Sequence, residues 1–202
     1  MKIIKTIVLF ASIILMTSCA SGYKKIEPKS INYVSTNINN GVKLEYKYDL
    51  LYKKYAKKET KKGVKLVAVK ITNETDKDLM LGRDIKLTYE NGNEIFALEN
   101  EKVFKSLKQS TAPYLLYLLL TPLNLYTTSS DGNTSSTPIG FVLGPGIAGG
   151  NMIAAGSANK KFKTELLDYN INGKLIKPGE TKYGIIGIKS NSFEALKVKV
   201  TY

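Results

Sequence analysis

The sequence contains no histidine and no tryptophan, and it has a single cysteine, Cys19, and a single arginine, Arg83. Without histidine the chain lacks the commonest general base and a common metal ligand, and one cysteine allows no internal disulfide. These absences remove most catalytic and metal-binding classes. We therefore expect no enzyme, no metal site and no cofactor.

The charge of the chain is strongly positive and is carried almost entirely by lysine. There are 30 basic and 17 acidic residues, a formal net charge of +13. Nucleic-acid binders usually use arginine forks for phosphates and base edges, so we expect no nucleic-acid partner. A diffuse lysine surface suits anionic lipid headgroups, and the alternative is an ordinary solvated surface.

The N-terminus carries the pattern of a secretory leader. Lys2 and Lys5 precede an apolar run at residues 6–16 that is too short to span a bilayer comfortably, and small residues then lead to Cys19. The segment Met16-Thr17-Ser18-Cys19 resembles the lipobox of bacterial lipoproteins, with Met16 where that family usually has leucine. The resemblance covers residues 1 to about 22. It implies cleavage before Cys19 and a lipid on this cysteine, with palmitate among the fatty acids of the modified residue.

The residues after the cysteine bear on location. Within the lipoprotein family, Ala20 in this position implies outer-membrane delivery, and Lys24 and Lys25 do not resemble acidic surface-export signals. The expected location is therefore the cell envelope, lipid-anchored in the outer membrane and facing the periplasm. The expected partner is the membrane, through the lipid on Cys19, with an envelope protein or a homo-oligomer as further partners.

Two stretches have the alternation of β-strands. Residues 42–50 alternate apolar and polar side chains, and residues 64–71 are apolar on both faces, as in a central strand. Asn91-Gly92 favours a tight hairpin turn, residues 53–62 read as a lysine-rich loop, and residues 174–176, 182–188 and 196–202 read as further strands.

The residues from Leu175 to Lys189, with a Lys-Pro-Gly-Glu turn before an apolar strand, resemble Ig-like modules of bacterial envelope lipoproteins. The predicted fold is mainly β, an Ig-like antiparallel β-sandwich with an inserted helical hairpin, and a small barrel is the alternative. No cysteine pair or core tryptophan supports a true immunoglobulin domain. The predicted segments are a signal peptide (1–18), a lipidated tether (19–40), the first part of the sandwich with a short amphipathic helix (41–110), the hairpin (111–159) and the rest of the sandwich (160–202).

The predicted hairpin is apolar and rich in glycine. Residues 111–126 and 138–158 carry no charge, and a Ser/Thr-rich loop joins them. Glycines four residues apart allow another helix to approach closely, and we assign this role to Gly140, Gly144, Gly146 and Gly150. The Gly144-Pro145-Gly146 sequence is also compatible with a kink or a buried loop.

Two sets of side chains are candidate contacts of the hairpin. The membrane or partner contacts are Leu115, Leu116, Leu118, Leu119, Leu120, Phe141, Val142, Leu143, Ile147, Met152 and Ile153. The headgroup contacts are Lys102, Lys105, Lys108, Lys160, Lys161 and Lys163, which flank the hairpin on both sides. The alternative is that the hairpin covers the sandwich or forms an oligomer interface.

These observations favour a non-enzymatic binding or scaffolding lipoprotein of the cell envelope. The alternatives are a membrane-active or self-assembling protein that acts through its Gly-rich hairpin, and an envelope hydrolase.

Overall fold

The structure is a computed structural model that describes residues 19–201, so the predicted signal peptide lies outside the described residues. It forms two compact units. The hairpin unit comprises residues 19–22 and 109–159, and the sheet unit comprises residues 23–108 and 160–201. Helices hold 32% and strands 31% of the chain, so the fold is mixed rather than mainly β as predicted.

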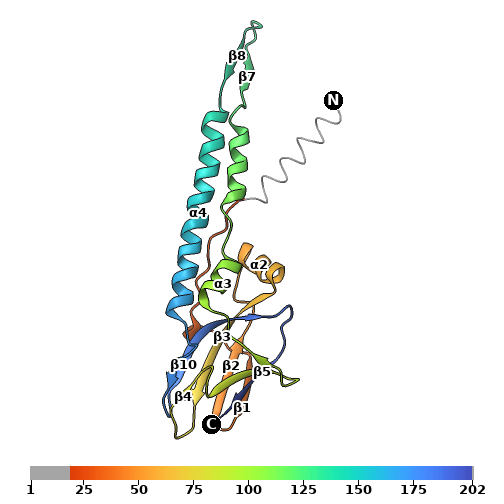
Figure 1. The fold of residues 1–202 in the computed structure, drawn as a ribbon. Helices are drawn as coiled ribbons and strands as arrows, with labels where there is room; N and C mark the ends of the chain where they lie inside the picture. The colour runs from red at the N-terminus through yellow and green to blue at the C-terminus, as the bar shows by residue number, and fades with distance from the viewer. Residues whose placement is uncertain (1–18, 202) are drawn as a thin grey trace. The chain divides into compact units, whose positions relative to one another are not determined.

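The sheet unit contains two larger antiparallel sheets and a short strand pair (Figure 1). The four-stranded sheet has the order β1 (Ser35–Asn39), β2 (Val42–Lys47), β3 (Val64–Asn73), β10 (Thr181–Lys189). The three-stranded sheet has the order β11 (Leu196–Val200), β5 (Ile85–Tyr89), β6 (Glu94–Ile95). The short pair is β4 (Leu79–Met80) with β9 (Leu175–Ile176).

The two larger sheets share one hydrophobic core. Val42, Leu44 and Tyr46 of β2 are buried while the residues between them are half-buried, which confirms the predicted alternation. Strand β3 lies between β2 and β10 and is buried on both faces, as its continuous apolar sequence predicts. The core continues through Ile85 and Leu87 of β5 and through β11.

Two helices pack on the other face of the four-stranded sheet. These are α2 (Lys54–Lys62) and α3 (Asn100–Leu107), and both contact β3. Helix α3 approaches β10 closely because Gly187 has no side chain: a Cβ there would collide with Val103. The short amphipathic helix predicted within residues 41–110 corresponds to α3, in which Val103 and Leu107 are buried.

The prediction of a loop at residues 53–62 is wrong, because these residues form α2. Tyr55 and Glu59 lie four residues apart and are both buried, so they fix one face of the helix. Gly63 then ends α2 in the left-handed conformation, with φ of 58°, which glycine adopts without strain.

The range predicted as a tether, 19–40, contains regular structure. It includes a short 3-10 helix, η1 (Pro28–Ser30), and strand β1, which pairs with β2 in register Ser35↔Tyr46. Ile26 and Pro28 are buried. The segment is thus part of the sheet unit from Tyr23 onward.

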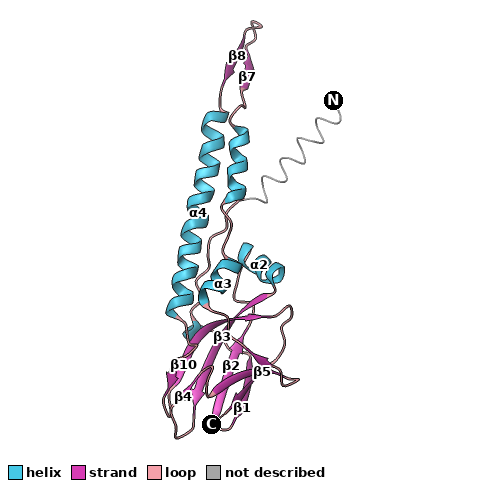
Figure 2. Ribbon diagram, in the orientation of Figure 1, coloured by secondary structure: helices cyan, strands magenta, loops and turns pink. Residues whose placement is uncertain are grey.

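The hairpin unit consists of the 3-10 helix η2 (Ala112–Leu120) beside the N-terminal part of α4 (Gly140–Asp168), with strands β7 (Leu125–Thr128) and β8 (Thr134–Thr137) between them in sequence (Figure 2). At three residues per turn, Tyr114 and Tyr117 of η2 lie on one face, and both are buried. They pack with Ala148 and Ala155 of α4. The predicted helical hairpin is therefore present, but an antiparallel ribbon replaces the end of its first helix and the Ser/Thr-rich loop.

Glu59 makes the stability of the sheet unit depend on pH. Burial raises the pKa of Glu59 to about 7, although its Oε1 accepts a 2.7 Å hydrogen bond from the Leu66 amide. An unfolded glutamate ionises near pH 4.5. The folded state therefore binds the extra proton between these values, and its stability falls as the pH rises through this window.

We expect Glu59→Gln to match the wild type at pH 4 and to be more stable by about 2 kcal/mol at pH 8, because the amide keeps an acceptor for Leu66 without the cost of a buried charge. Urea unfolding at the two pH values measures the difference. An equal difference at both would contradict the assignment.

Candidate functional site

The predicted lipid attachment site, Cys19, is exposed, and the two residues after it are held by hydrogen bonds. The Ala20 amide donates to Asn151 Oδ1 at 2.6 Å. The Ser21 amide donates to Gln109 Oε1 at 3.0 Å, and Gln109 Nε2 donates to the Ser21 carbonyl at 2.6 Å. The chain beside the cysteine is therefore fixed to the hairpin unit.

The Asn159 side chain in turn holds Gln109 in place by two hydrogen bonds. Asn159 Oδ1 accepts from the Gln109 backbone amide at 2.8 Å, and Asn159 Nδ2 donates to the Gln109 carbonyl at 2.9 Å. Ser21 and Gln109 are both buried, and the Ala20 side chain packs against the core of the hairpin. Because buried peptide groups are costly to leave unpaired, these amides give the segment a single preferred position.

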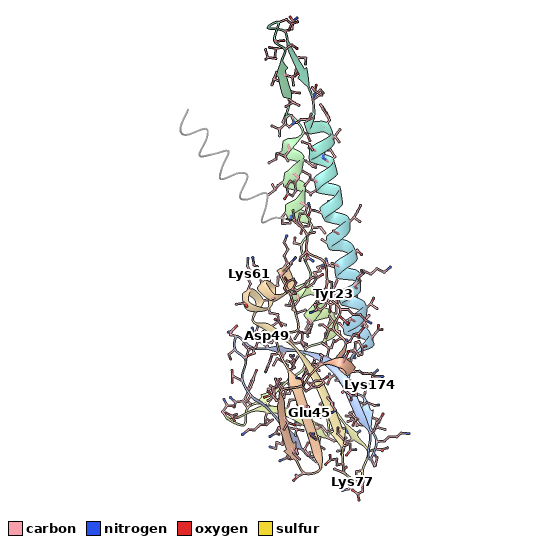
Figure 3. All side chains as sticks on the ribbon, turned by 180° about the vertical axis from the view of Figure 1, so that it is seen from behind. Tyr23, Glu45, Asp49, Lys61, Lys77 and Lys174 are labelled. Carbon is pink, nitrogen blue, oxygen red and sulfur yellow. The ribbon has the colours of Figure 1, made fainter. Side chains whose placement is uncertain are left out.

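The next residues are held within the sheet unit. Tyr23, labelled in Figure 3, donates a hydrogen bond to Glu165 Oε2, and the Ile26 amide donates to Glu165 Oε1 at 2.8 Å. The Tyr23 ring lies 5.3 Å from the rings of both Tyr55 and Phe162. Glu165 is buried, and this burial raises the pKa of its carboxyl group. Its hydrogen bonds to Tyr23 and to the Ile26 amide are therefore structural contacts. We refer to residues 20–26 as the anchor strap.

The hairpin unit presents an apolar surface to solvent. Between residues 109 and 159 the only charged residue is Asp131. The exposed fractions are 74% for Leu119, 75% for Val142 and 75% for Ile153. A helix face in water normally carries charges, and exposed apolar patches mark interaction sites.

Most of the predicted contact residues lie on this surface, and three do not. Leu120, Ile147 and Met152 pack against the hairpin's own core. The exposed members are Leu115, Leu116, Leu118, Leu119, Phe141, Val142, Leu143 and Ile153. The sequence reading missed Leu123, Leu125 and Tyr126, which are also exposed. Their signal was present, since they belong to the same uncharged segment. We call this exposed set the apolar surface.

The four glycines assigned to helix packing have two different environments. A Cβ on Gly140 would collide with the carbonyl oxygens of Leu120 and Thr121, and one on Gly144 would lie 3.0 Å from the Tyr117 carbonyl. These two glycines therefore allow α4 to lie against η2. Around Gly146 and Gly150 nothing lies within 4 Å of the Cβ position.

Three of the six lysines assigned to headgroups are paired with acids. Lys102 Nζ lies 3.3 Å from Glu99, and Lys105 and Lys163 lie 3.7 Å and 3.2 Å from Glu101. The pKa of Glu101 is lowered, chiefly by its hydrogen bond with Lys163. The ammonium groups of Lys108 and Lys163 lie 5.6 Å and 5.2 Å from the Phe104 ring centre. Lys160 and Lys161 form no ion pair within residues 19–201.

The described helices include none that combines the length and the apolar character needed to cross a membrane. Across residues 19–201, no group of three or more acidic or cysteine side chains could hold a metal ion. No protein-family model, curated protein sequence or solved structure matches this chain.

Proposed function

We propose that the chain is a lipid-anchored lipoprotein of the cell envelope that acts as a non-enzymatic binding or scaffolding module, in the outer membrane and facing the periplasm. The lipid is attached to Cys19, and the apolar surface of the hairpin unit contacts the membrane that holds the lipid. The sheet unit carries the presented binding surface, and its two sheets around one core support an Ig-like sandwich as its fold.

One observation carries the proposal: the predicted anchor and the apolar surface belong to the same compact unit. The Ala20 amide is bonded to Asn151 of α4, so a lipid on the preceding residue leaves the chain beside the hairpin. Insertion of that lipid brings the hairpin to the bilayer, where burial of leucine and phenylalanine side chains is favourable.

The polar ribbon indicates how the hairpin meets the membrane. Strands β7 and β8 are exposed throughout, and their hydroxyls pair across the strands, with Thr127 Oγ1 and Ser135 Oγ 2.8 Å apart. Asp131 lies in the turn between the strands. Such a tip is costly to bury in hydrocarbon. We therefore propose that the hairpin lies along the membrane surface.

A second candidate is self-assembly through α4. Gly146, Gly149, Gly150 and Gly156 have open space around their Cβ positions, and small residues allow two helices to approach closely. The size of the protein in detergent separates the candidates, because a monomer argues against assembly. An envelope hydrolase is a weaker candidate, since the buried Glu59 and Glu165 carboxylates bind backbone amides.

Metabolic labelling with an alkyne fatty acid tests the anchor in cells that produce the full-length chain. We expect the wild type to be labelled and Cys19→Ala to be unlabelled, because Cys19 is the only cysteine in the chain and the proposed site of the lipid. Ser18→Ala keeps a small residue before the cysteine and should remain labelled. An unlabelled wild type, or label that persists in Cys19→Ala, would overturn the proposal.

A further inference from the structure

Helix α2 carries an unusual density of lysine. Residues 53–62 include six lysines, which form two stripes at four-residue spacing along the helix. Lys53, Lys57 and Lys61 make one stripe, and Lys54, Lys58 and Lys62 make the other. Of these, Lys53, Lys57, Lys61 and Lys62 are exposed and the other two are half-buried.

Four of the six lysines are not paired with acids. No ion pair with an acid is found, in the described part of the chain, for Lys57, Lys58, Lys61 or Lys62. Lys102 of α3 and Lys163 of α4, by contrast, each pair with a glutamate. The only acid within α2, Glu59, is buried and faces β3. The pKa of Lys58 is lowered by partial burial and then by repulsion from Lys62, Lys108 and Lys61, as expected in a positive field.

The helix that carries these lysines has a fixed support. Tyr55 and Glu59 are 1% and 3% exposed and anchor α2 in the sheet unit by the face opposite Lys57 and Lys61, while Lys58 and Lys62 flank that buried face. Lys58 Nζ also donates a hydrogen bond to the Lys108 carbonyl, which joins α2 to the end of α3. The lysine face is therefore a defined surface and not part of a mobile loop.

The anchor strap connects this helix to the predicted lipid site by a short length of chain. The Tyr23 ring packs edge-on against Tyr55 of α2 at 5.3 Å. Cys19 is four residues before Tyr23, so a fully extended chain spans at most about 14 Å between them. Whatever the arrangement of the two units, a lipid on Cys19 keeps α2 near a membrane.

We propose that the lysine face of α2 is a second membrane-contact surface, which binds the anionic headgroups of phospholipids by charge. The proposal rests on the proposed lipid anchor, which supplies the membrane. Lysine alone, without arginine forks or a groove, gains affinity from a diffuse negative surface and needs no specific geometry. A lipid surface therefore fits better than an acidic peptide, which would require defined pairing.

The test uses the mature chain, residues 19–202, with Cys19→Ser so that no lipid contributes. Sedimentation with vesicles of phosphatidylcholine, with and without phosphatidylglycerol, measures binding at low and high salt. We expect stronger binding to the anionic vesicles, reduced by salt. Because each lysine near an anionic surface contributes about a fivefold factor, Lys57→Gln/Lys58→Gln/Lys61→Gln/Lys62→Gln should reduce that binding at least about 30-fold.

A matched variant removes the same charge elsewhere on the sheet unit. Lys77 lies toward the end of the unit away from Lys61 (Figure 3), and Lys174, Lys177 and Lys199 are exposed as it is. Changing these four to glutamine should leave anionic binding within about twofold of the wild type. Circular dichroism checks that both variants are folded.

Equal losses in the two variants, or no loss in the α2 variant, would overturn the α2 proposal. Binding to neutral vesicles depends on the apolar surface and not on α2. A wild-type chain that binds neutral vesicles, but binds anionic vesicles no more strongly, would contradict this proposal and leave the hairpin contact standing. The alkyne label on Cys19 reports the anchor separately from both.

Discussion

Replacing Leu116, Leu119, Phe141 and Val142 together by glutamine is expected to weaken binding of the unlipidated mature chain to neutral phosphatidylcholine vesicles at least about 100-fold. These four side chains are 67–75% exposed on the apolar surface. Each contributes roughly 1.5–3 kcal/mol when fully buried in an apolar environment, and partial burial at an interface yields a fraction of this. Vesicle flotation at several lipid concentrations measures the change.

The sheet unit offers a matched control for this experiment. Val34, Ile38, Phe96 and Phe193 are 53–74% exposed, so their replacement by glutamine removes a similar apolar area. We expect this control to float like the wild type. If both variants bind equally, or if the wild type does not float at all, the apolar surface is not a membrane contact.

Gln109→Ala is expected to free the first residues of the anchor strap and to lower the hydrogen-exchange protection of the Ser21 amide at least about 30-fold. The glutamine side chain pairs with both the amide and the carbonyl of Ser21 in a buried position. Its removal leaves two peptide groups unpaired, which costs roughly 1–3 kcal/mol for each group that stays buried. Release of the segment into water avoids that cost.

Asn151→Ala separates this effect from a general loosening of α4. Within the anchor strap, Asn151 accepts a hydrogen bond only from the Ala20 amide. Its replacement should therefore speed hydrogen exchange at the Ala20 amide and leave the Ser21 amide, which is bonded to Gln109, protected. Unchanged protection of Ser21 in Gln109→Ala would contradict the assigned role of the glutamine. Loss of protection throughout residues 140–159 in either variant would indicate unfolding of the hairpin instead.

The strands of the sheet unit could be predicted from the sequence because alternation at period two is a local signal. β2 and β11 lie within the predicted ranges, and β3 and β10 cover their predicted ranges and extend beyond them by one or two residues. Helix α2 was missed because its charge suggested a solvated loop, although lysine, alanine and glutamate favour helices. The contact that holds α2 in place is the hydrogen bond from the Leu66 amide to the buried Glu59 carboxylate. It forms only when α2 packs on β3, so local sequence does not indicate it.

The anchor strap could not be predicted from local pattern. Residues 20–26 have the polar composition of a tether, but their partners are distant in sequence: Gln109 is 88 residues from Ser21, and Asn151 is 131 residues from Ala20. The same holds for the headgroup lysines, because Lys163 meets Glu101 only when α4 packs on α3. The apolar hairpin itself was predictable, since an uncharged stretch of this length is evident in the sequence.

The most direct test of the membrane contact uses the absence of tryptophan from the chain. Phe141→Trp places a single fluorophore on the apolar surface, and Phe96→Trp places one at a similarly exposed site in the sheet unit, the two positions being 67% and 73% exposed. In vesicles that contain lipids with brominated acyl chains, the lipidated protein should show strong quenching at position 141 and little at position 96. Equal quenching at both positions, or none at 141, would contradict a hairpin that lies in the membrane surface beside its lipid.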